Sequence, residues 1–188
     1  MDYKEFWDHL YEKKYELNTL YSDYWNDYSS FGTWQFWVVL SLLIIPLIIL
    51  CFTIDRKRIF ELFFFGYTIH MLWTYIDIAL GRNGYFVHKY FLTPLLPNAA
   101  NITASVLPVG FLLTYQYCKN KQKNFYLYTG IISALFAFVF ASVEEYIGFV
   151  EFRKGMNQLY LFLLDIVIVF CSYWFTKFIL RVKNGVNS

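Results

Sequence analysis

Three carboxylates and a histidine stand inside segments that are otherwise apolar enough to cross a bilayer. They are His70 and Asp77 in the segment 59–80, Glu144 in 125–150 and Asp165 in 158–180. A charged group deep in a membrane helix costs about 2.5 to 3.5 kcal/mol and therefore faces the bundle interior or water. We predict that the four side chains form a polar site on the outer side; such a cluster could serve as a metal site, a proton relay or the floor of an outward-facing binding cavity. The alternative is that they form salt bridges and hydrogen bonds between helices without any further function.

Four further residues near the same side are secondary candidates for this site, namely Tyr75, Arg82, Glu145 and Arg153. Tyr75 carries a hydroxyl that can donate to a ligand, and the two arginines bring positive charge to the rim. Glu145 is turned by about 100° from its neighbour on a helix, so we expect it on the flank or the outer surface. The steps of four and three from His70 through Thr74 to Asp77 place these residues on one helix face, which we expect to point inward.

The composition predicts an all-α polytopic membrane protein. Hydrophobic residues make up 58% of the 188 residues and charged residues 16%, and the mean hydropathy is +0.39. These values are typical of membrane proteins. We expect no nucleic-acid partner, because no basic run is interleaved with aromatic residues. We expect no metal site, because the three cysteines form neither a C-x-x-C pair nor a zinc spacing with histidine. The sequence does not indicate a cofactor.

The chain divides into an N-terminal helix, a membrane domain and a short tail. Residues 1–31 predict an amphipathic extracytoplasmic helix, whose stripe includes Phe6, Leu10, Leu17 and Tyr21. We expect this stripe to rest on the outer leaflet or on the bundle, or to cover the outer mouth as a lid. Residues 32–183 predict a five-helix transmembrane bundle, followed by a tail over 184–188. The expected spans are about 34–54, 59–80, 98–117, 125–150 and 158–180, and Pro108 leaves the continuity of the third open.

Basic residues near the span ends predict the orientation. Clusters at 56–58, 119–123 and 177–183 follow the first, third and fifth spans. Cytoplasmic loops carry an excess of lysine and arginine, so these ends are expected inside, with the N-terminus outside and the C-terminus cytoplasmic. In the fourth span, steps of three and four predict a small-residue packing face that also carries Glu144. Its members are Gly130, Ala134, Ala137, Ala141, Glu144 and Gly148.

Two enzyme families share short features with this chain. The pair Glu144-Glu145 is similar to the Glu-Glu-x-x-x-Arg motif of intramembrane prenyl-protein proteases, but Phe149 stands where the arginine belongs. Membrane lycopene cyclase domains also carry a Glu-Glu helix, and an Asp followed by a Gly-aromatic loop, which here would be Asp77 and Gly84-Tyr85. Neither match extends beyond these few residues.

A longer match is to an uncharacterised family. The stretch from about 58 to 180 resembles small multipass membrane proteins of spore-forming Gram-positive bacteria. The residues that carry the resemblance are Arg58-Ile59-Phe60-Glu61, Phe65-Gly66, Trp73-Thr74-Tyr75-Ile76-Asp77, Leu107-Pro108-Val109 and Tyr115-Gln116-Tyr117. The resemblance implies a bacterial cell-membrane protein and implies no activity.

Together these patterns predict an integral plasma-membrane protein that acts as a binding, sensing or accessory component with an outer-side polar site. The alternative is an intramembrane enzyme that acts on a lipid or isoprenoid substrate through buried carboxylates. The expected partners are the lipid bilayer, a lipid ligand, and a protein partner or a second copy in a homo-oligomer.

Overall fold

Most of the chain is helical, at 79% in the computed structural model, which describes residues 2–185. The helices are α1 (Tyr3–Tyr28), α2 (Trp34–Thr53), α3 (Ile59–Arg82), α4 (Leu107–Lys121), α5 (Phe125–Ala134), α6 (Ala141–Tyr146) and α7 (Gln158–Gly185). The 3-10 turn η1 (Arg56–Arg58) precedes α3, and the π-helical turns η2 (Ile102–Val106) and η3 (Leu135–Phe140) precede α4 and α6. Of the predicted tail, residues 184 and 185 continue α7 and residues 186–188 lie outside the described part.

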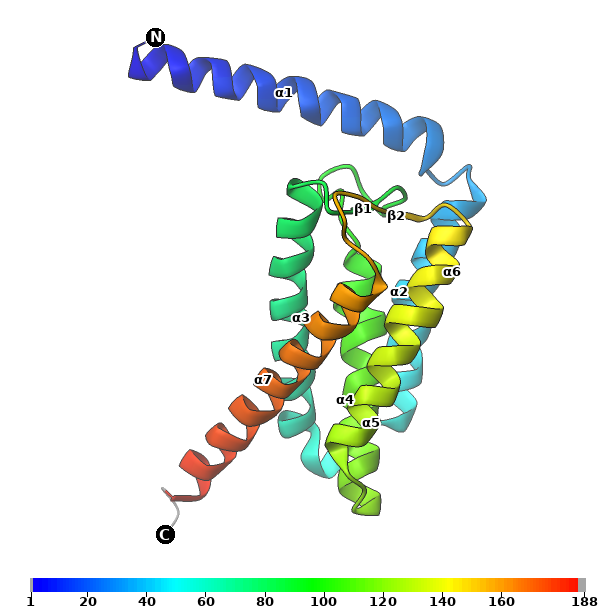
Figure 1. Cartoon of the computed structure of the whole chain (residues 1–188), viewed down its shortest axis with the longest axis vertical. Coiled ribbons are helices and arrows are strands. Elements are labelled where there is room, and N and C mark those ends of the chain that lie inside the picture. The colour runs from blue at the N-terminus through cyan, green and yellow to red at the C-terminus, as the bar shows by residue number, and fades with distance from the viewer. Residues whose placement is uncertain (1, 186–188) are drawn as a thin grey trace.

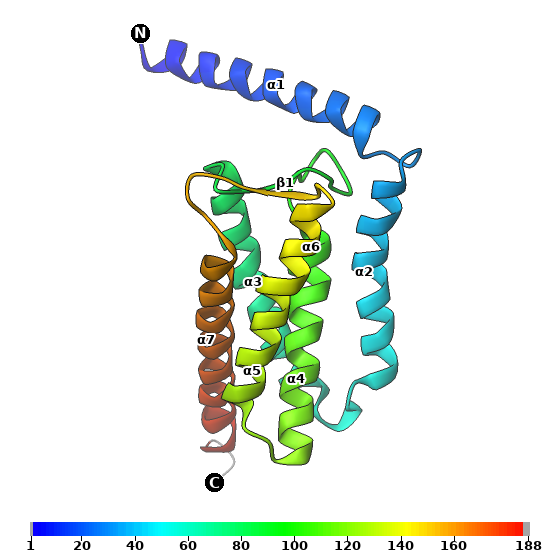
Figure 2. The ribbon, with the colours of Figure 1, turned by 45° about the vertical axis from the view of Figure 1, so that its right-hand side comes forward.

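Four helical stretches are long and apolar enough to cross a membrane, which confirms the prediction of a helical membrane protein. They are Trp34–Thr53, Arg56–Arg82, Phe125–Tyr146 and Gln158–Lys183. Figures 1 and 2 show α2, α3, α4, the α5–α6 column and α7 running side by side, while α1 lies across the end that carries the loops after α3 and α6. Local signals set the turns between them. Thr33 accepts the amide of Phe36 at the start of α2, and Asn124 accepts those of Tyr126 and Leu127 at the start of α5.

The segment before Lys121 is one continuous helical run from residue 100, although Pro108 stands inside it. Proline lacks the amide that would bond the carbonyl four residues earlier. The π turn η2 lies just before the proline, where the Leu107 amide donates to the Ile102 carbonyl, so the run continues through the irregularity. At 1.5 Å per residue this run spans about 33 Å, close to the thickness of a bilayer core. It is also a central element, since α4 contacts α2, α3 and α5.

The predicted small-residue face of the fourth span is wrong in its first half. Before η3 the buried residues of the column are Phe125, Thr129 and Ser133, instead of Gly130 and Ala134. A π turn inserts one extra residue and rotates the following helix by about 100° relative to the preceding one. Within the π turn the expected residue Ala137 is buried, and after it Ala141 and Glu144 also face the interior.

Glycine allows close helix contact on α4 instead. A Cβ atom built on Gly110 would meet the Phe136 ring at 2.6 Å, whereas one on Gly130 would meet nothing within 4 Å. Phe136 also packs edge-on against Phe111 of α4, with ring centroids 5.4 Å apart. The close approach of the α5–α6 column therefore depends on Gly110.

A two-stranded antiparallel ribbon, absent from the all-α prediction, closes one end of the helices. It pairs β1 (Phe86–His88) with β2 (Val150–Phe152), in the register Phe86↔Phe152, Val87↔Glu151 and His88↔Val150. The predicted fourth span ran to Val150, but α6 ends at Tyr146. Gly148 there has φ +79, a left-handed conformation that suits glycine and turns the chain into β2. The ribbon joins the end of α3 to the end of α6.

Helix α1 contacts the rest of the chain at its C-terminal end. The Trp25 indole donates to the carbonyl of Phe91 at 3.0 Å, and the Phe91 ring stacks on Tyr24 with centroids 6.1 Å apart. Phe6, Leu10 and Leu17 are about half exposed, so this part of the predicted stripe does not dock on the bundle. The lid expectation is not met at these residues, because the ring contacts of α1 with the rest of the chain begin at Tyr21, which meets Phe91, and continue at Trp25, which meets Phe31 and Phe36. Contact of the stripe with lipid stays a prediction.

Candidate functional site

A buried cavity of about 40 Å³ lies under the ribbon and collects acidic side chains from three helices and a histidine from the ribbon. These are Asp77 of α3, His88 of β1, Glu144 of α6 and Asp165 of α7. Apolar walls come from Phe136, Phe140 and Leu161. A water molecule needs about 10 to 15 Å³ of such volume, so the cavity has room for a few waters or a group of that size.

Asp77 and His88 form a buried pair. The Asp77 Oδ1 atom lies 2.9 Å from His88 Nε2, and the two side chains are 3% and 8% exposed. The Asp77 Oδ2 atom accepts the backbone amide of Ala99 at 3.3 Å. Burial lowers the pKa of His88, but the charges of Asp77 and Glu144 and the hydrogen bond to Asp77 together raise it above its ordinary value. When His88 is protonated, its imidazolium neutralises one carboxylate of the cavity.

The Glu144 carboxyl group is buried without a hydrogen-bond partner among the described residues. It is 7% exposed, and its carboxylate forms no hydrogen bond or ion pair with the residues 2–185 that the structure describes. Its backbone carbonyl accepts the amide of Phe149 at 2.7 Å at the end of α6, and its side chain lines the cavity. A buried charge with no partner is costly. The Glu144 carboxylate is therefore the group of the cavity that most needs a counter-charge.

Asp165 accepts one hydrogen bond. The Trp73 indole Nε1 donates to Asp165 Oδ1 at 3.0 Å, and both side chains are buried at 3% and 2% exposure. A carboxylate has about four acceptor positions, so one indole leaves acceptor capacity directed at the cavity. Trp73 and Asp77 are four residues apart on α3, which places the tryptophan and the Asp77–His88 pair on the same face.

His70 lies outside this cavity, so the prediction that it belongs to the same site as Asp77 is wrong. Its Nδ1 atom is 3.0 Å from the carbonyl oxygen of Thr103 and 3.3 Å from the hydroxyl of Thr74. It lines a separate apolar cavity of about 150 Å³ between α2, α3 and α4. Seven helical residues place it about 10 Å deeper than Asp77, where the irregular turn η2 offers a carbonyl. His70 thus has a structural partner of its own.

The secondary candidates also lie away from the cavity. Tyr75 is 65% exposed, and Arg82 is exposed at the end of α3. Glu145 accepts the Gln158 amide at 2.7 Å on the outer surface, as its 100° turn from Glu144 predicts. Arg153 pairs with Glu151 at 3.6 Å on the exposed ribbon. These residues therefore do not complete the site.

Two residues of the site, His88 and Trp73, are not among the candidates that the sequence predicts. The alternation Phe86-Val87-His88 is a strand signal that would have pointed His88 and Phe86 to one side, toward the bundle. Within residues 2–185, no three His, Cys, Asp or Glu side chains stand close enough to hold a metal ion.

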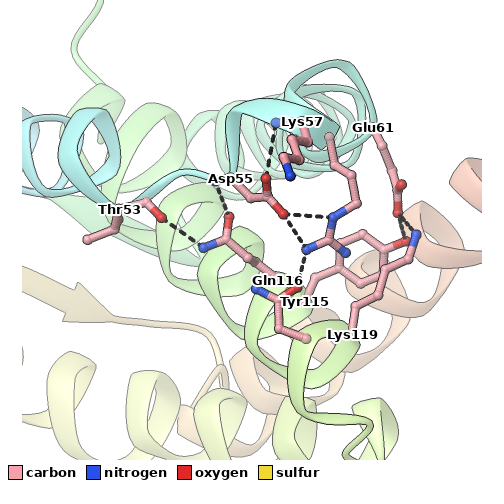
Figure 3. A network of polar contacts seen from close by, with 9 residues as sticks. Thr53, Asp55, Lys57, Glu61, Tyr115, Gln116 and Lys119 are labelled. Atoms are coloured by element: carbon pink, nitrogen blue, oxygen red, sulfur yellow. Dashed lines mark hydrogen bonds and ion pairs between the residues drawn. The ribbon is translucent and has the colours of Figure 1, made fainter.

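A second polar network lies at the opposite end of the helices (Figure 3). Asp55 accepts the Arg58 guanidinium at 3.0 and 2.9 Å and the Lys57 amide at 3.0 Å. Hydrogen bonds from Arg58 and from the Lys57 amide hold the pKa of Asp55 below its ordinary value. The Asp55 amide donates to Gln116 of α4 at 2.8 Å, so the turn between α2 and α3 is fastened to α4.

Comparisons with known proteins add no assignment to this geometry. No family model matches the chain, and neither the curated proteins nor the solved structures include a significant match. The case for function therefore rests on the site and on the membrane character of the helices.

Proposed function

We propose that this chain crosses a bacterial plasma membrane five times, with its N-terminus outside and its C-terminus cytoplasmic. Four crossings follow from apolar helices, and the helical run over 100–121 supplies the fifth. This run leads from the end with the ribbon to the end where α5 begins, as Figure 2 lets the reader follow. The basic clusters at 56–58, 119–123 and 177–183 all lie at the end away from α1, which supports a cytoplasmic assignment for that end.

Cysteine labelling tests this orientation. The three native cysteines are free, so they are first replaced by serine. We expect Gly32→Cys and Gly84→Cys to react with an impermeant maleimide on intact cells, because both lie at the end near α1. Lys121→Cys should react only after the cells are opened. Reaction of Lys121→Cys on intact cells would overturn the orientation.

We further propose that the protein is a binding component whose outer-side cavity takes the ammonium group of a small organic cation. The unpartnered, buried Glu144 carboxylate carries this proposal. His88 pairs with Asp77, whereas Asp165 receives only a neutral indole donor, so neither Asp165 nor Glu144 has a cationic side chain as a partner within residues 2–185. An ammonium group is about the size of a water molecule and has three donors, and the apolar walls suit the adjoining carbon atoms. The intramembrane enzyme stays an alternative prediction.

Ligand-dependent stabilisation tests the binding proposal. Butylammonium should raise the thermal midpoint of the purified protein in neutral detergent, and butanol at the same concentration should not. At a hundred times the dissociation constant, binding stabilises by about 2.7 kcal/mol. Glu144→Gln keeps the shape of the side chain and should abolish the butylammonium effect. Glu145→Gln is the matched control, because it removes the same charge one residue away on the outer surface. Equal butylammonium shifts in the two variants would refute the site.

A further inference from the structure

A pocket of about 370 Å³ opens at the end of the molecule opposite the ribbon, between α4, α5 and α7. Four basic residues line it, namely Lys119, Lys123, Lys177 and Arg181. Its volume falls within the range of small-molecule sites. The cation cavity under the ribbon shares no lining residue with it, so the two sites are independent.

Within the described residues, one of these four positive charges is compensated by an acidic group. Lys119 pairs with Glu61 of α3, which also accepts the Tyr115 hydroxyl (Figure 3). The Lys177 ammonium lies 4.4 Å from the centroid of the Tyr173 ring. Lys123 and Arg181 are exposed and form no ion pair with any residue in 2–185. The pocket therefore carries an excess of three positive charges.

Beneath the basic groups the pocket is aromatic. Phe125 and Tyr173 stack with ring centroids 4.4 Å apart, and Tyr115 meets both rings edge-on. Leu180 adds an aliphatic wall. A ligand that fills this pocket would place an anionic group among the basic side chains and an apolar part against the rings.

The pocket also lies at the level of a membrane surface. Its lining residues stand at the beginning of the apolar stretch Phe125–Tyr146 and at the end of Gln158–Lys183. A phospholipid phosphate lies at this depth, and basic pockets between transmembrane helices bind anionic headgroups. We propose that this pocket binds the phosphate of an anionic phospholipid, with the glycerol and first acyl carbons against the aromatic floor. The proposal rests on the membrane placement but not on the cation site.

The test is a titration of the full-length protein with phosphatidylglycerol in neutral micelles, with the first bound lipid counted by native mass spectrometry. Phosphatidylcholine is the neutral reference. Lys123→Gln combined with Arg181→Gln removes two uncompensated charges of the pocket. Each basic residue near a membrane surface contributes roughly a fivefold gain in affinity, so the double variant should bind phosphatidylglycerol about 30-fold more weakly.

The matched control combines Lys121→Gln with Lys183→Gln, which removes two charges at the same end but outside the pocket. We expect this control to weaken binding by less than about fivefold. An equal loss in both double variants would overturn the pocket and leave only general surface charge. If a thermal scan shows that the pocket variant is misfolded, Arg181→Gln alone replaces it, with Lys183→Gln as its control.

A second set of titrations separates the two sources of phosphate. Inorganic phosphate and glycerol 3-phosphate should bind at least a hundredfold more weakly than phosphatidylglycerol, because neither brings acyl carbons to the aromatic floor. If either soluble phosphate binds as tightly as the lipid and loses binding in the pocket variant, the occupant is a soluble phosphate and the lipid proposal is refuted. Equal retention of phosphatidylcholine and phosphatidylglycerol would also refute it.

Discussion

The most direct stability prediction concerns Asp77, which joins α3 to the ribbon. Asp77→Leu has similar bulk, but it leaves the buried His88 imidazole and the Ala99 amide without their acceptor. Removing one partner of a buried pair typically costs 3 to 5 kcal/mol, and an orphaned amide costs about 1 to 3 kcal/mol. These costs overlap, because both groups can relax toward water once the pair is broken. We expect Asp77→Leu to lower the free energy of unfolding by about 3 to 5 kcal/mol.

A double-mutant cycle separates the pair from other effects of the substitution. His88→Leu alone should cost a similar amount, because it leaves a buried carboxylate beside Glu144. The double variant replaces both members with apolar groups, which is often close to neutral, so most of the lost stability should return. The control is Lys89→Gln at the exposed pair with Glu151, where the loss should stay below about 1 kcal/mol.

Equilibrium unfolding in mixed micelles of dodecyl maltoside and dodecyl sulfate, followed by tryptophan fluorescence, measures all four proteins. The reasoning fails if Asp77→Leu is neutral or stabilising, since the carboxylate would then be a cost that its partner does not offset. It also fails if the losses in the two single variants simply add in the double variant.

Three further predictions rest on the same geometry. The pKa of His88 is raised in the folded protein, so the Asp77–His88 pair should stabilise the fold fully below the unfolded-state pKa of about 6.5. This contribution to the free energy of unfolding should be lost as the pH rises through the folded-state pKa of His88. Unfolding measured as a function of pH should show the loss in the wild-type protein and not in Asp77→Leu. Gly110→Ala should destabilise by about 1 to 3 kcal/mol because its methyl group overlaps a phenylalanine ring, whereas Gly130→Ala should be neutral or stabilising; equal midpoints would contradict the contact. Deleting residues 1–20 should leave the butylammonium response unchanged, because helix α1 contacts the bundle beyond them; a changed response would restore the lid hypothesis.

Helical periodicity and the polarity of the segments were enough to predict three residues of the site from the sequence. Burying Asp77, Glu144 or Asp165 in an apolar segment costs free energy, and the predicted alternation of the spans places all three near the same end of the bundle. The structure places these three around one cavity. The separation of Glu144 from Glu145 likewise follows from the 100° step between neighbouring helical residues.

The features that the sequence did not reveal depend on contacts between distant segments. His88 reaches Asp77 because β1 pairs with β2, and these strands lie on either side of α4 and α5 in the chain. The two π turns change the direction in which the next helix faces, yet their residues, such as Thr103 and Phe138, are ordinary in type. A regular period of 3.6 therefore predicts the wrong face before η3, and nothing in residue type alone marks the shift.

The central helix α4 is less apolar than α2, α3, α5 and α7, and this explains why apolarity alone identifies four helical stretches that could cross a membrane. A helix exposed to lipid must be apolar around most of its circumference, whereas one shielded by other helices can carry hydroxyl and amide groups. On α4, the side chains of Phe111, Leu112 and Tyr115 are at most 4% exposed. By contrast, 17% of the residues in the apolar window of α2 are buried. The chain must still return from the ribbon end to the end that bears Lys123 before α5 can run back. The proposed orientation, with the ribbon on one side of the membrane and the basic pocket on the other, therefore requires this polar central helix as the fifth crossing.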